Sequence, residues 1–519
     1  MDWDRDGNFS ETNHDITAYV QQLTFNVGFW QPFMEVADEM TCTMTLFNAT
    51  KRFSPEYSAG PLYAFEWSLR PVRVTAQVNV VDGSGNFVID GSGNFVVTQT
   101  VMWTGWTDEI RPSFNEKGDL IAIMTCHGPK QFLQGAKAYI PLQIDKRTDE
   151  IIEVLLDEVR LPPATANGPW ALGVVGFSEL GTKTYLQNQG LNYSLETGRE
   201  TIPYAGDTWE DGINVLDAIA QTVQDERGRF FFDRSGNAVF WNRHHMLLKS
   251  SVDATITNAV MGASYAYGEN MRNVVEVKFK PRAVDSIATT LWTSTEEVTI
   301  ERDETKEIQA RFSEQDSDSK ISAIDVVKPS TAAGTLTFQN RTAVLTGWEV
   351  DAKGAKMTFT NSAGTDVIIT LITITGKRLT AYNEALVTER DGTSVFKRGE
   401  RTLSLRLPML SAQSSAEAIA KYELARRKDP EGEMINISLR AIDDTNTNLM
   451  LGLTVGSRIT LTEAQTGHSA DYIIVGEAHQ VRDGLILHDV TWTLEAASRN
   501  NFWVLGVSTL GVSTVLAPL

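Results

Sequence analysis

The sequence predicts a mainly β fold with α+β parts, and three observations lead to this prediction. Polar and apolar residues alternate in many short runs, as in TCTMTLF (41–47), which has the period of a strand with one buried face. Short polar turns separate the runs, a pattern typical of antiparallel barrels and sandwiches. Apolar residues at helical spacing are confined to a few segments in the middle and near the end of the chain.

The first unit, residues 1–130, is predicted to be a β-barrel-like domain of four or five strands. Its strand-like runs are separated by polar loops, one of which holds a perfect duplication, DGSGNFV at 82–88 and again at 90–96. The duplication is interpreted as a hairpin tip. Its glycines have the spacing of neither a phosphate-binding loop nor a dinucleotide fingerprint, and Asp82 and Asp90 are too few carboxylates for a calcium loop.

The second unit, residues 131–250, is predicted to be an α+β domain of helices followed by a hairpin. A helix is expected within 148–163, where apolar residues fall on one face and Pro162 and Pro163 end the pattern. A second helix is expected within 212–228, with Gly228 as its stop. It leads into the hairpin RFFFD, turn, AVFWNR (229–243).

The remaining chain is predicted to form a second β-rich domain with an insertion. Residues 251–290 and 377–498 are assigned to the domain, which includes a helix at 415–428 opened by a capping box at Ser414–Glu417. Residues 291–376, rich in Thr and Ser, read as an inserted β-sandwich. Residues 499–519 are expected to form an extended C-terminal arm.

Charge and cysteine usage exclude several classes of protein. Asp and Glu (66) outnumber Lys and Arg (46), giving a net charge of -20, which argues against a dedicated nucleic-acid binder or a protein drawn to anionic lipid. Cys42 and Cys126 lie in strand-like runs and are expected to be small buried residues of a chain made in a reducing cytoplasm. The start of the chain lacks the pattern of a signal peptide.

No catalytic, cofactor or metal motif stands out in the sequence. The adjacent His244 and His245 would face opposite ways in a strand and could not share a metal. GFSELG (176–181) lacks the spacing of a nucleophile elbow. Asp316 and Asp318 fit a solvated acidic loop better than a cation site. We therefore expect no catalytic residue, no cofactor and no metal, although a pair of carboxylates for glycoside cleavage stays open in so acidic a chain.

The tryptophans leave two readings open. Trp103 and Trp106 lie in one predicted strand and could form a platform for a sugar. Aromatic residues of this kind more often fill cores and subunit contacts, and that is the expectation here.

Several segments, kept in order along most of the chain, resemble the baseplate hub or tail-tip (minor tail) proteins of long-tailed bacteriophages. The segments are TCTMTLFNATKRFSPEYSAGPLY (41–63), LRPVRV (69–74), MWTGWTDEI (102–110), VLDAIAQTVQDERGRFFFDRSGNAVF (215–240), RTLSLRLPMLSAQSSAEAIAKYELARRKDP (401–430), SADYIIVGEAHQV (469–481), VTWTLEAA (490–497) and FWVLGVSTLGVSTVLAP (502–518). Each segment alone is weakly specific.

The resemblance implies a structural, non-enzymatic role at the distal end of the tail of a virion. Proteins of this kind form homotrimers in which two barrel-like hub domains per subunit give a pseudo-sixfold ring. The implied partners are the distal tail and tail-tube proteins, the tip or central-fibre proteins and the tape measure protein. DNA would pass through the ring during ejection, and an acidic lining would not hold it. No specific nucleic-acid binding and no stable membrane insertion are expected.

Two other functions remain open from the sequence. A tail-associated cell-wall hydrolase is one, although no segment reads as a separate catalytic domain. A receptor- or carbohydrate-binding tip protein that uses 291–376 for host attachment is the other.

The uncharged chain end is expected to dock on another protein. Its length would allow a membrane span, but Gly506, Gly511 and Pro518 interrupt the apolar residues, and an extended strand fits the composition better. The residues expected to dock on a neighbouring subunit or tip protein are Phe502, Trp503, Val504, Leu505, Val507, Leu510, Val512, Val515 and Leu516.

Overall fold

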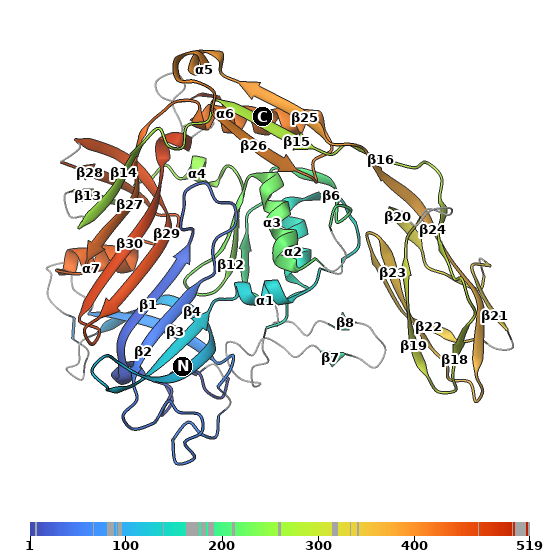
Figure 1. The fold of residues 1–519 in the computed structure, drawn as a ribbon, viewed down its shortest axis with the longest axis horizontal. Coiled ribbons are helices and arrows are strands. Elements are labelled where there is room, and N and C mark those ends of the chain that lie inside the picture. The colour runs from blue at the N-terminus through green and yellow to red at the C-terminus, as the bar shows by residue number, and fades with distance from the viewer. Residues whose placement is uncertain are drawn as a thin grey trace.

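The computed structural model shows a broad β-rich body with a smaller β unit beside it (Figure 1). The structure describes residues 1–5, 8–65, 67–79, 88–89, 91, 96–138, 140–161, 176–177, 183–184, 191–209, 213–257, 261–313, 320–332, 334–339, 342–464, 467–500, 502–503 and 515–516.

The body is built on one sheet of eleven strands, in the order β14-β27-β30-β29-β1-β2-β5-β4-β3, with β28 beside β29 and β13 beside β28. Its strands are β1 (Val20–Gly28), β2 (Thr41–Phe47), β3 (Pro71–Asn79), β4 (Val97–Phe114), β5 (Leu120–His127), β13 (Ala254–Thr257), β14 (Gly262–Tyr267), β27 (Gly432–Arg440), β28 (Arg458–Glu463), β29 (His468–Arg482) and β30 (Leu487–Ala496). Strands from both ends of the chain thus share one sheet.

The N-terminal half of this sheet follows the predicted alternation. In β2 the residues at even positions are buried, and Cys42 lies opposite Cys126 of β5. Both cysteines are buried and free, as the sequence predicts. Trp103 and Trp106 of β4 are buried as well, so these two tryptophans belong to the core and form no exposed sugar platform.

The two halves meet where β1 pairs with β29 in an antiparallel ladder from Leu23 opposite Val481 to Gly28 opposite Gly476. A side chain at Gly476 would clash, because a Cβ atom there would lie 1.8 Å from the carbonyl oxygen of Phe29. Glycine therefore allows the two backbones to approach closely enough to pair. We call this ladder the seam.

The middle unit packs directly on the N-terminal half, and the two share one hydrophobic core. Its helices are α1 (Lys130–Gly135), α2 (Thr148–Leu156), α3 (Val215–Glu226) and α4 (His245–Leu248). Its strands are β6 (Gln143–Arg147), β7 (Gly176–Phe177), β8 (Lys183–Thr184), β9 (Tyr193–Leu195), β10 (Thr201–Ala205), β11 (Arg229–Phe232) and β12 (Ala238–Trp241). The predicted hairpin is the antiparallel pair of β11 and β12.

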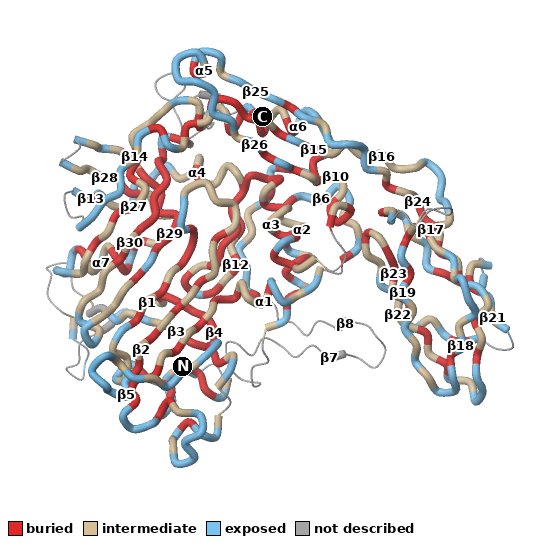
Figure 2. The backbone as a smooth tube through the Cα atoms, viewed as in Figure 1, coloured by how far each residue is buried: buried red, intermediate tan, exposed pale blue. Residues whose placement is uncertain are grey.

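The C-terminal half has two further cores. One lies between its part of the large sheet and α7 (Asp444–Gly452). The other lies where α6 (Gln413–Arg427) covers the three-stranded sheet β25-β15-β26. The strands of that sheet are β15 (Val274–Phe279), β25 (Ala385–Arg390) and β26 (Thr402–Leu407), and α5 (Gly392–Arg398) lies between the last two. Figure 2 shows the buried positions running through the middle of the body.

The smaller unit has its own core and lies at one side of the body (Figure 1). The long strand β24 (Val367–Ala381) pairs with five shorter strands, and β23 lies between β19 and β22 in a second sheet. The shorter strands are β16 (Arg282–Val284), β17 (Thr289–Thr293), β18 (Val298–Ile300), β19 (Thr305–Arg311), β20 (Ser322–Val327), β21 (Leu336–Gln339), β22 (Val344–Asp351) and β23 (Gly354–Thr360).

Two details differ from the sequence-based expectations. Within the described strands the large sheet does not close into barrels, because strands of the two expected barrel-like units pair through the seam and leave β14 and β3 at its ends. The prediction of a capping box at Ser414 was wrong. Helix α6 begins at Gln413, so Ser414 lies in its first turn, and the N-cap residue Ala412 makes no side-chain cap. The domain limits given above stay predictions.

Short elements complete the chain. They are the 3-10 helices η1 (Thr17–Tyr19) and η2 (Ala497–Asn500) and the strands β31 (Phe502–Trp503) and β32 (Val515–Leu516). No helix in the described part of the chain is long and apolar enough to cross a membrane. Asp82, Asp90, Asp316 and Asp318 lie outside the described residues.

Candidate functional site: a buried charge network between three parts of the chain

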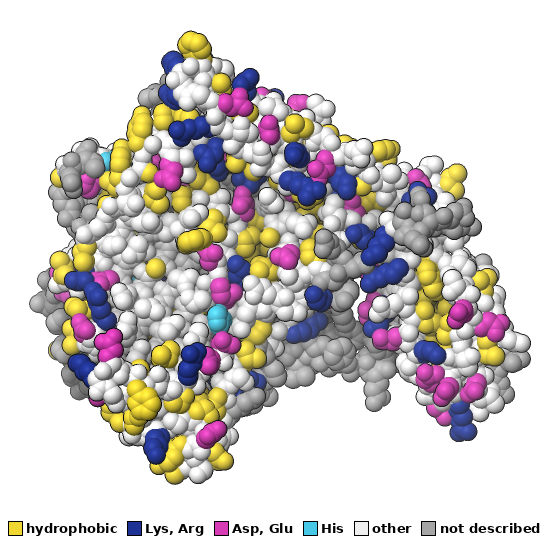
Figure 3. Space-filling model, viewed as in Figure 1, with side chains coloured by type: hydrophobic (Ala, Val, Ile, Leu, Met, Phe, Trp, Pro, Cys, Tyr) yellow, Lys and Arg dark blue, Asp and Glu magenta, His cyan; other side chains and the backbone are white. Residues whose placement is uncertain are grey.

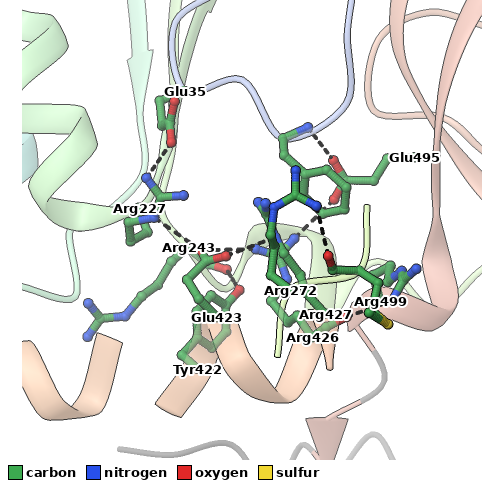
Figure 4. A network of polar contacts seen from close by, with 12 residues as sticks. Glu35, Arg227, Arg243, Arg272, Tyr422, Glu423, Arg426, Arg427, Glu495 and Arg499 are labelled. Carbon is green, nitrogen blue, oxygen red and sulfur yellow. Dashed lines mark hydrogen bonds and ion pairs between the residues drawn. The ribbon is translucent and has the colours of Figure 1, made fainter. Parts of the chain in front are cut away.

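Seven charged side chains meet inside the body, where the N-terminal half, the middle unit and the C-terminal half come together (Figure 4). We call them the junction network; its members are Glu35, Arg227, Arg229, Glu423, Arg426, Arg427 and Glu495. Charged groups are rarely buried unless they are paired. The pairing here connects segments that lie far apart in the sequence.

Arg227 connects all three parts. It follows α3 as the C-cap residue, in the left-handed region at φ 59, and its side chain is 4% exposed. Its Nε donates to Glu423 at 3.0 Å, and its Nη1 forms an ion pair with Glu35. Next to Glu35, the backbone N–H of Ala37 donates to the carbonyl of Phe230 at 2.8 Å. The end of α3 is therefore held to both other parts.

Glu423 is the first centre of the network. It lies on the buried face of α6 and is fully buried. Besides Arg227, it faces Arg427 at 3.1 Å and Arg426 at 3.6 Å. One carboxylate is thus surrounded by three guanidinium groups.

Glu495, at the end of β30, is the second centre. Its carboxylate accepts a hydrogen bond from Arg426 at 3.0 Å and one from the backbone N–H of Phe33 at 3.0 Å, and it forms an ion pair with Arg229 of β11. The guanidinium of Arg427 lies over the ring of Phe33, 3.9 Å from its centroid. The loop around Phe33 is therefore held between α6 and β30 by both charge and stacking.

The pKa values show that the two central carboxylates, Glu423 and Glu495, stay charged. Burial alone would raise the pKa of Glu423, but Arg227, Arg427 and Arg426 outweigh it and hold the pKa of this carboxyl well below its ordinary value. The pKa of Glu495 is lowered in the same way against its burial by Arg229 and Arg426. Burial is the main reason that the pKa of Arg427 falls to about 10. At neutral pH Glu423, Glu495 and Arg427 are therefore ionised.

A second buried pair lies close to the seam. Arg234, in the turn between β11 and β12, holds Glu477 of β29 with two hydrogen bonds of 2.8 and 2.5 Å. The same guanidinium donates to the carbonyls of Leu451 and Leu453 at 2.7 and 2.8 Å. Burial opposes ionisation, yet Arg234 and His479 lower the pKa of Glu477 to about 2. This pair connects the middle unit to the C-terminal half beside the seam.

The smaller unit is connected by one buried ion pair of its own. Arg282 of β16 donates to both carboxylate oxygens of Asp207 at 2.6 and 3.0 Å, and neither side chain is exposed by more than 3%. A charged cavity of about 870 Å³ lies next to this pair, and its lining includes Asp217, Lys280 and Glu384. Charges of both signs line it.

The junction network is suited to holding parts of the chain together rather than to catalysis. Arginine does not lose its proton in the physiological range, and the lowered pKa values of Glu423 and Glu495 make these carboxylates weak proton acceptors near pH 7, so the pairs are poorly suited to acid–base catalysis. Removing one partner of a buried ion pair typically destabilises a protein by about 3–5 kcal/mol. The network is therefore expected to fix the three parts in one relative position.

The docking residues predicted in the arm are only partly described. Phe502 and Trp503 form β31, which pairs in parallel with Val515 and Leu516 of β32. Val504, Leu505, Val507, Leu510 and Val512 lie outside the described residues. Just before the arm, Arg499 is 3% exposed and donates to Glu433 at 2.5 Å and to the carbonyl of Asp429 at 2.9 Å.

Sequence reasoning missed the junction network. Its residues come from segments as distant as Glu35 and Glu495, and nothing in the local pattern pairs them. One signal was present: Glu423 lies at a position that helical spacing places beside Ile419 on the buried face of α6. A charged residue on such a face indicates a buried partner.

Solved structures of tail proteins are among those that match this chain. A tail protein of Neisseria meningitidis is 9% identical, with a TM-score of 0.46 over 92% of this chain and 92% of that one. A 43 kDa tail protein of prophage MuSo2 of Shewanella oneidensis is 9% identical, with a TM-score of 0.42 over 92% and 95% of the two chains. Prophage tail protein gp18 of Listeria monocytogenes is 8% identical, with a TM-score of 0.37 over 92% and 88%.

No protein-family model matches the sequence, and no curated protein matches it.

Proposed function

We propose that this protein is a structural component of a bacteriophage tail tip, three copies of which form a hub ring. The first support is the order of the segments that resemble hub proteins, which runs from residue 41 to residue 518. The ring connects the tail tube above it to the tip or central fibre below it. The protein is placed at the distal end of the virion tail, next to the tape measure protein.

The observation that carries the proposal is the seam. Through it, strands from the two halves of the chain form one continuous sheet, from β14 at one end to β3 at the other. The junction network and the pair of Arg234 and Glu477 hold the halves in place from inside. In the proposed ring, each subunit contributes two β-rich halves, so three copies would present six faces.

The two ends of the sheet favour assembly. In the described strands, β14 pairs only with β27, and Tyr265 and Tyr267 of β14 are 45% and 71% exposed. An open strand edge with exposed aromatic residues invites pairing with another chain. Unlike edges at opposite ends of one subunit suit head-to-tail contacts, which give a ring when the rotation between subunits closes.

The charge of the protein suits a passage for DNA. A net charge of -20 argues against tight binding of the DNA phosphates. Side chains of both signs are present on the face seen in Figure 3.

Imaging of an intact particle together with mass measurement tests the proposal. We expect three copies of the chain in a ring between the tail tube and the tip. A stable monomer or a hexamer in the particle, or a position away from the distal end of the tail, would contradict it.

The proposed absence of enzymatic activity is tested separately. Purified protein is incubated with peptidoglycan, and no turnover is expected. Turnover that single Asp or Glu substitutions abolish would favour a tail-associated hydrolase instead.

A role in host attachment is proposed for the smaller unit alone. Its separate core and its place at one side of the body support this, since such a unit can contact a surface without disturbing the ring. Deleting residues 286–377 removes the predicted insertion 291–376 and joins Asp285 to Arg378, whose carbonyl accepts a hydrogen bond from the backbone N–H of Asp285 at 2.9 Å. This deletion should abolish adsorption and leave tail assembly intact. Loss of assembly would contradict a role limited to attachment.

A further inference from the structure

Three potential metal ligands lie together at the start of the chain. The carboxylates of Asp2 and Asp4 and a ring nitrogen of His14 all lie within 4.8 Å of one another. Asp2 is fully buried and His14 is 2% exposed, whereas Asp4 faces solvent. Two buried ligands and one exposed ligand leave the cluster open to an ion from one side.

The fold holds both ends of this segment on the N-terminal sheet. The backbone N–H of Asp2 donates to the carbonyl of Pro71 at 2.9 Å, where β3 begins. The indole of Trp3 is buried and lies edge-on to Trp67, with centroids 5.5 Å apart. At the other end, Arg52 donates to the side chain of Asn13 at 2.9 Å. The ligands are therefore carried by an anchored segment.

The His14 side chain is oriented as a metal ligand would be. Its Nδ1 lies 2.8 Å from the carbonyl oxygen of Asn8, to which it donates. Within the described residues its Nε2 makes no hydrogen bond, and the carboxylate of Glu11 is 3.8 Å away. Metal-binding histidines characteristically donate one ring N–H to a carbonyl, because this leaves the lone pair of the other nitrogen for the ion.

The sequence adds an independent indication. Asp2, Asp4 and Asp6 alternate and are followed by Gly7, which is the spacing at the start of a calcium-binding loop. The twelfth position of such a loop holds Asn13 in place of the usual glutamate, so a weaker site is expected. Asp6 and Gly7 lie outside the described residues, and the site is assigned here to Asp2, Asp4 and His14.

We propose that Asp2, Asp4 and His14 bind a divalent cation, and that this cation is calcium. Carboxylate oxygens are the ligands that calcium prefers, and the aspartate spacing favours calcium. The imidazole of His14 is a more usual ligand of zinc, so zinc is the competing ion that the test must separate from calcium. The ion adds to the positive charge of the N-terminal amino group and Arg73, which already interact with Asp2. By binding Asp2 and His14 together, it connects the start of the chain to residue 14. The site is independent of the proposed place in a tail.

Terbium luminescence provides the test, with the full chain as the sample. Terbium replaces calcium at oxygen-rich sites, and Trp3, between the two aspartates in sequence, is placed to sensitise its emission. We expect sensitised emission that calcium displaces with a single tight component. Asp4→Asn should weaken calcium binding at least tenfold, and because Asp4 is exposed the variant should keep its fold, as circular dichroism can verify.

Asp108→Asn is the matched control. Asp108 is 59% exposed and lies on the same half of the sheet, so its loss should leave the tight component unchanged. This control is needed because a chain with net charge -20 binds cations weakly in many places. Absence of a tight component, or equal effects of the two substitutions, would overturn the proposal.

The identity of the ion is tested by titration with zinc and by His14→Gln. Tight binding of zinc without binding of calcium, lost in the His14 variant, would overturn the assignment of calcium. Calcium should also raise the melting temperature of the wild-type chain, because an ion that binds only the folded state stabilises it. The rise should be smaller in Asp4→Asn.

Discussion

The ring of Phe25 in β1 lies flat on the imidazole of His479 in β29, with ring centroids 4.6 Å apart and the two planes 10° apart. The two residues are direct partners across the seam. The same imidazole contacts His488 at 2.9 Å and Glu477 at 3.3 Å. The stacked pair therefore connects the N-terminal strand to the buried polar groups of the C-terminal half.

Phe25→Ala is expected to weaken the seam. Phe25 is 4% exposed, and truncation of a buried phenylalanine typically costs about 3–5 kcal/mol because a cavity and a lost stacking contact add to the lost burial. Urea unfolding measures the loss. The control is Phe114→Ala on β4, whose side chain is 70% exposed and whose loss should stay within about 0.5 kcal/mol. Equal losses would contradict the role given to the seam.

Glu423→Gln tests the junction network. The substitution leaves Arg227, Arg426 and Arg427 buried around a neutral amide, so we expect a loss of about 3–5 kcal/mol in the free energy of unfolding. The matched control is Glu400→Gln: this glutamate is 53% exposed and pairs with Arg390 at 2.6 Å. An exposed pair of this kind is worth about 1 kcal/mol or less. If Glu423→Gln lowered the free energy of unfolding by no more than Glu400→Gln does, the network would contribute little to stability.

Acid should weaken the contact between Arg234 and Glu477. The pKa of Glu477 is lowered to about 2 in the folded chain from 4.5, because hydrogen bonds from Arg234 and His479 outweigh burial. Because the pKa of Glu477 is lower in the folded chain than in the unfolded chain, its ionised carboxylate stabilises the folded chain. This stabilisation is complete above pH 4.5 and disappears as the pH falls towards 2. This difference in pKa corresponds to about 3 kcal/mol in the free energy of unfolding.

Unfolding of wild type and Glu477→Gln at several pH values measures this effect. The difference between the two free energies of unfolding should be largest near neutral pH and shrink steadily below pH 4.5. A difference that does not change with pH would refute the assignment.

Truncation after Arg499 should separate folding from assembly. Arg499 keeps its contacts with Glu433 and Asp429 in the shortened chain, so the subunit should fold with an unchanged melting temperature. Without the arm, we expect few or no complete particles in a complementation assay. Normal particles from the truncated chain would show that the arm is not needed for docking.

Local patterns in the sequence predicted individual elements well. The alternation of TCTMTLF gives β2 at its observed ends, and the apolar stripe before Gly228 gives α3. These signals are local, because burial of one face needs only the spacing of neighbouring residues. The predicted start of α6 was wrong because the serines suggested a capping box. The helix begins one residue before Ser414, and the side chain of Gln413 donates a hydrogen bond to Glu417 at 2.7 Å.

The seam and the two charged sites could not be derived in this way. Pairing of Leu23 with Val481 joins residues from opposite ends of the chain, and periodicity carries no information about such a register. The same holds for Glu35 and Glu423, which meet only through Arg227. The cluster at Asp2 was predictable in part, since its aspartate spacing is visible in the sequence.

The smaller unit leaves and rejoins the body at one point. Arg282 lies opposite Ala381 in the ladder of β16 and β24, and the N–H of Tyr382 donates to the carbonyl of Pro281 at 2.9 Å. The two chain crossings are therefore neighbours, and a tight turn could join them in place of the whole unit. Such a position suits exchange: one body could carry different outer units, acquired by recombination or inserted by design, with no change to its own sheet.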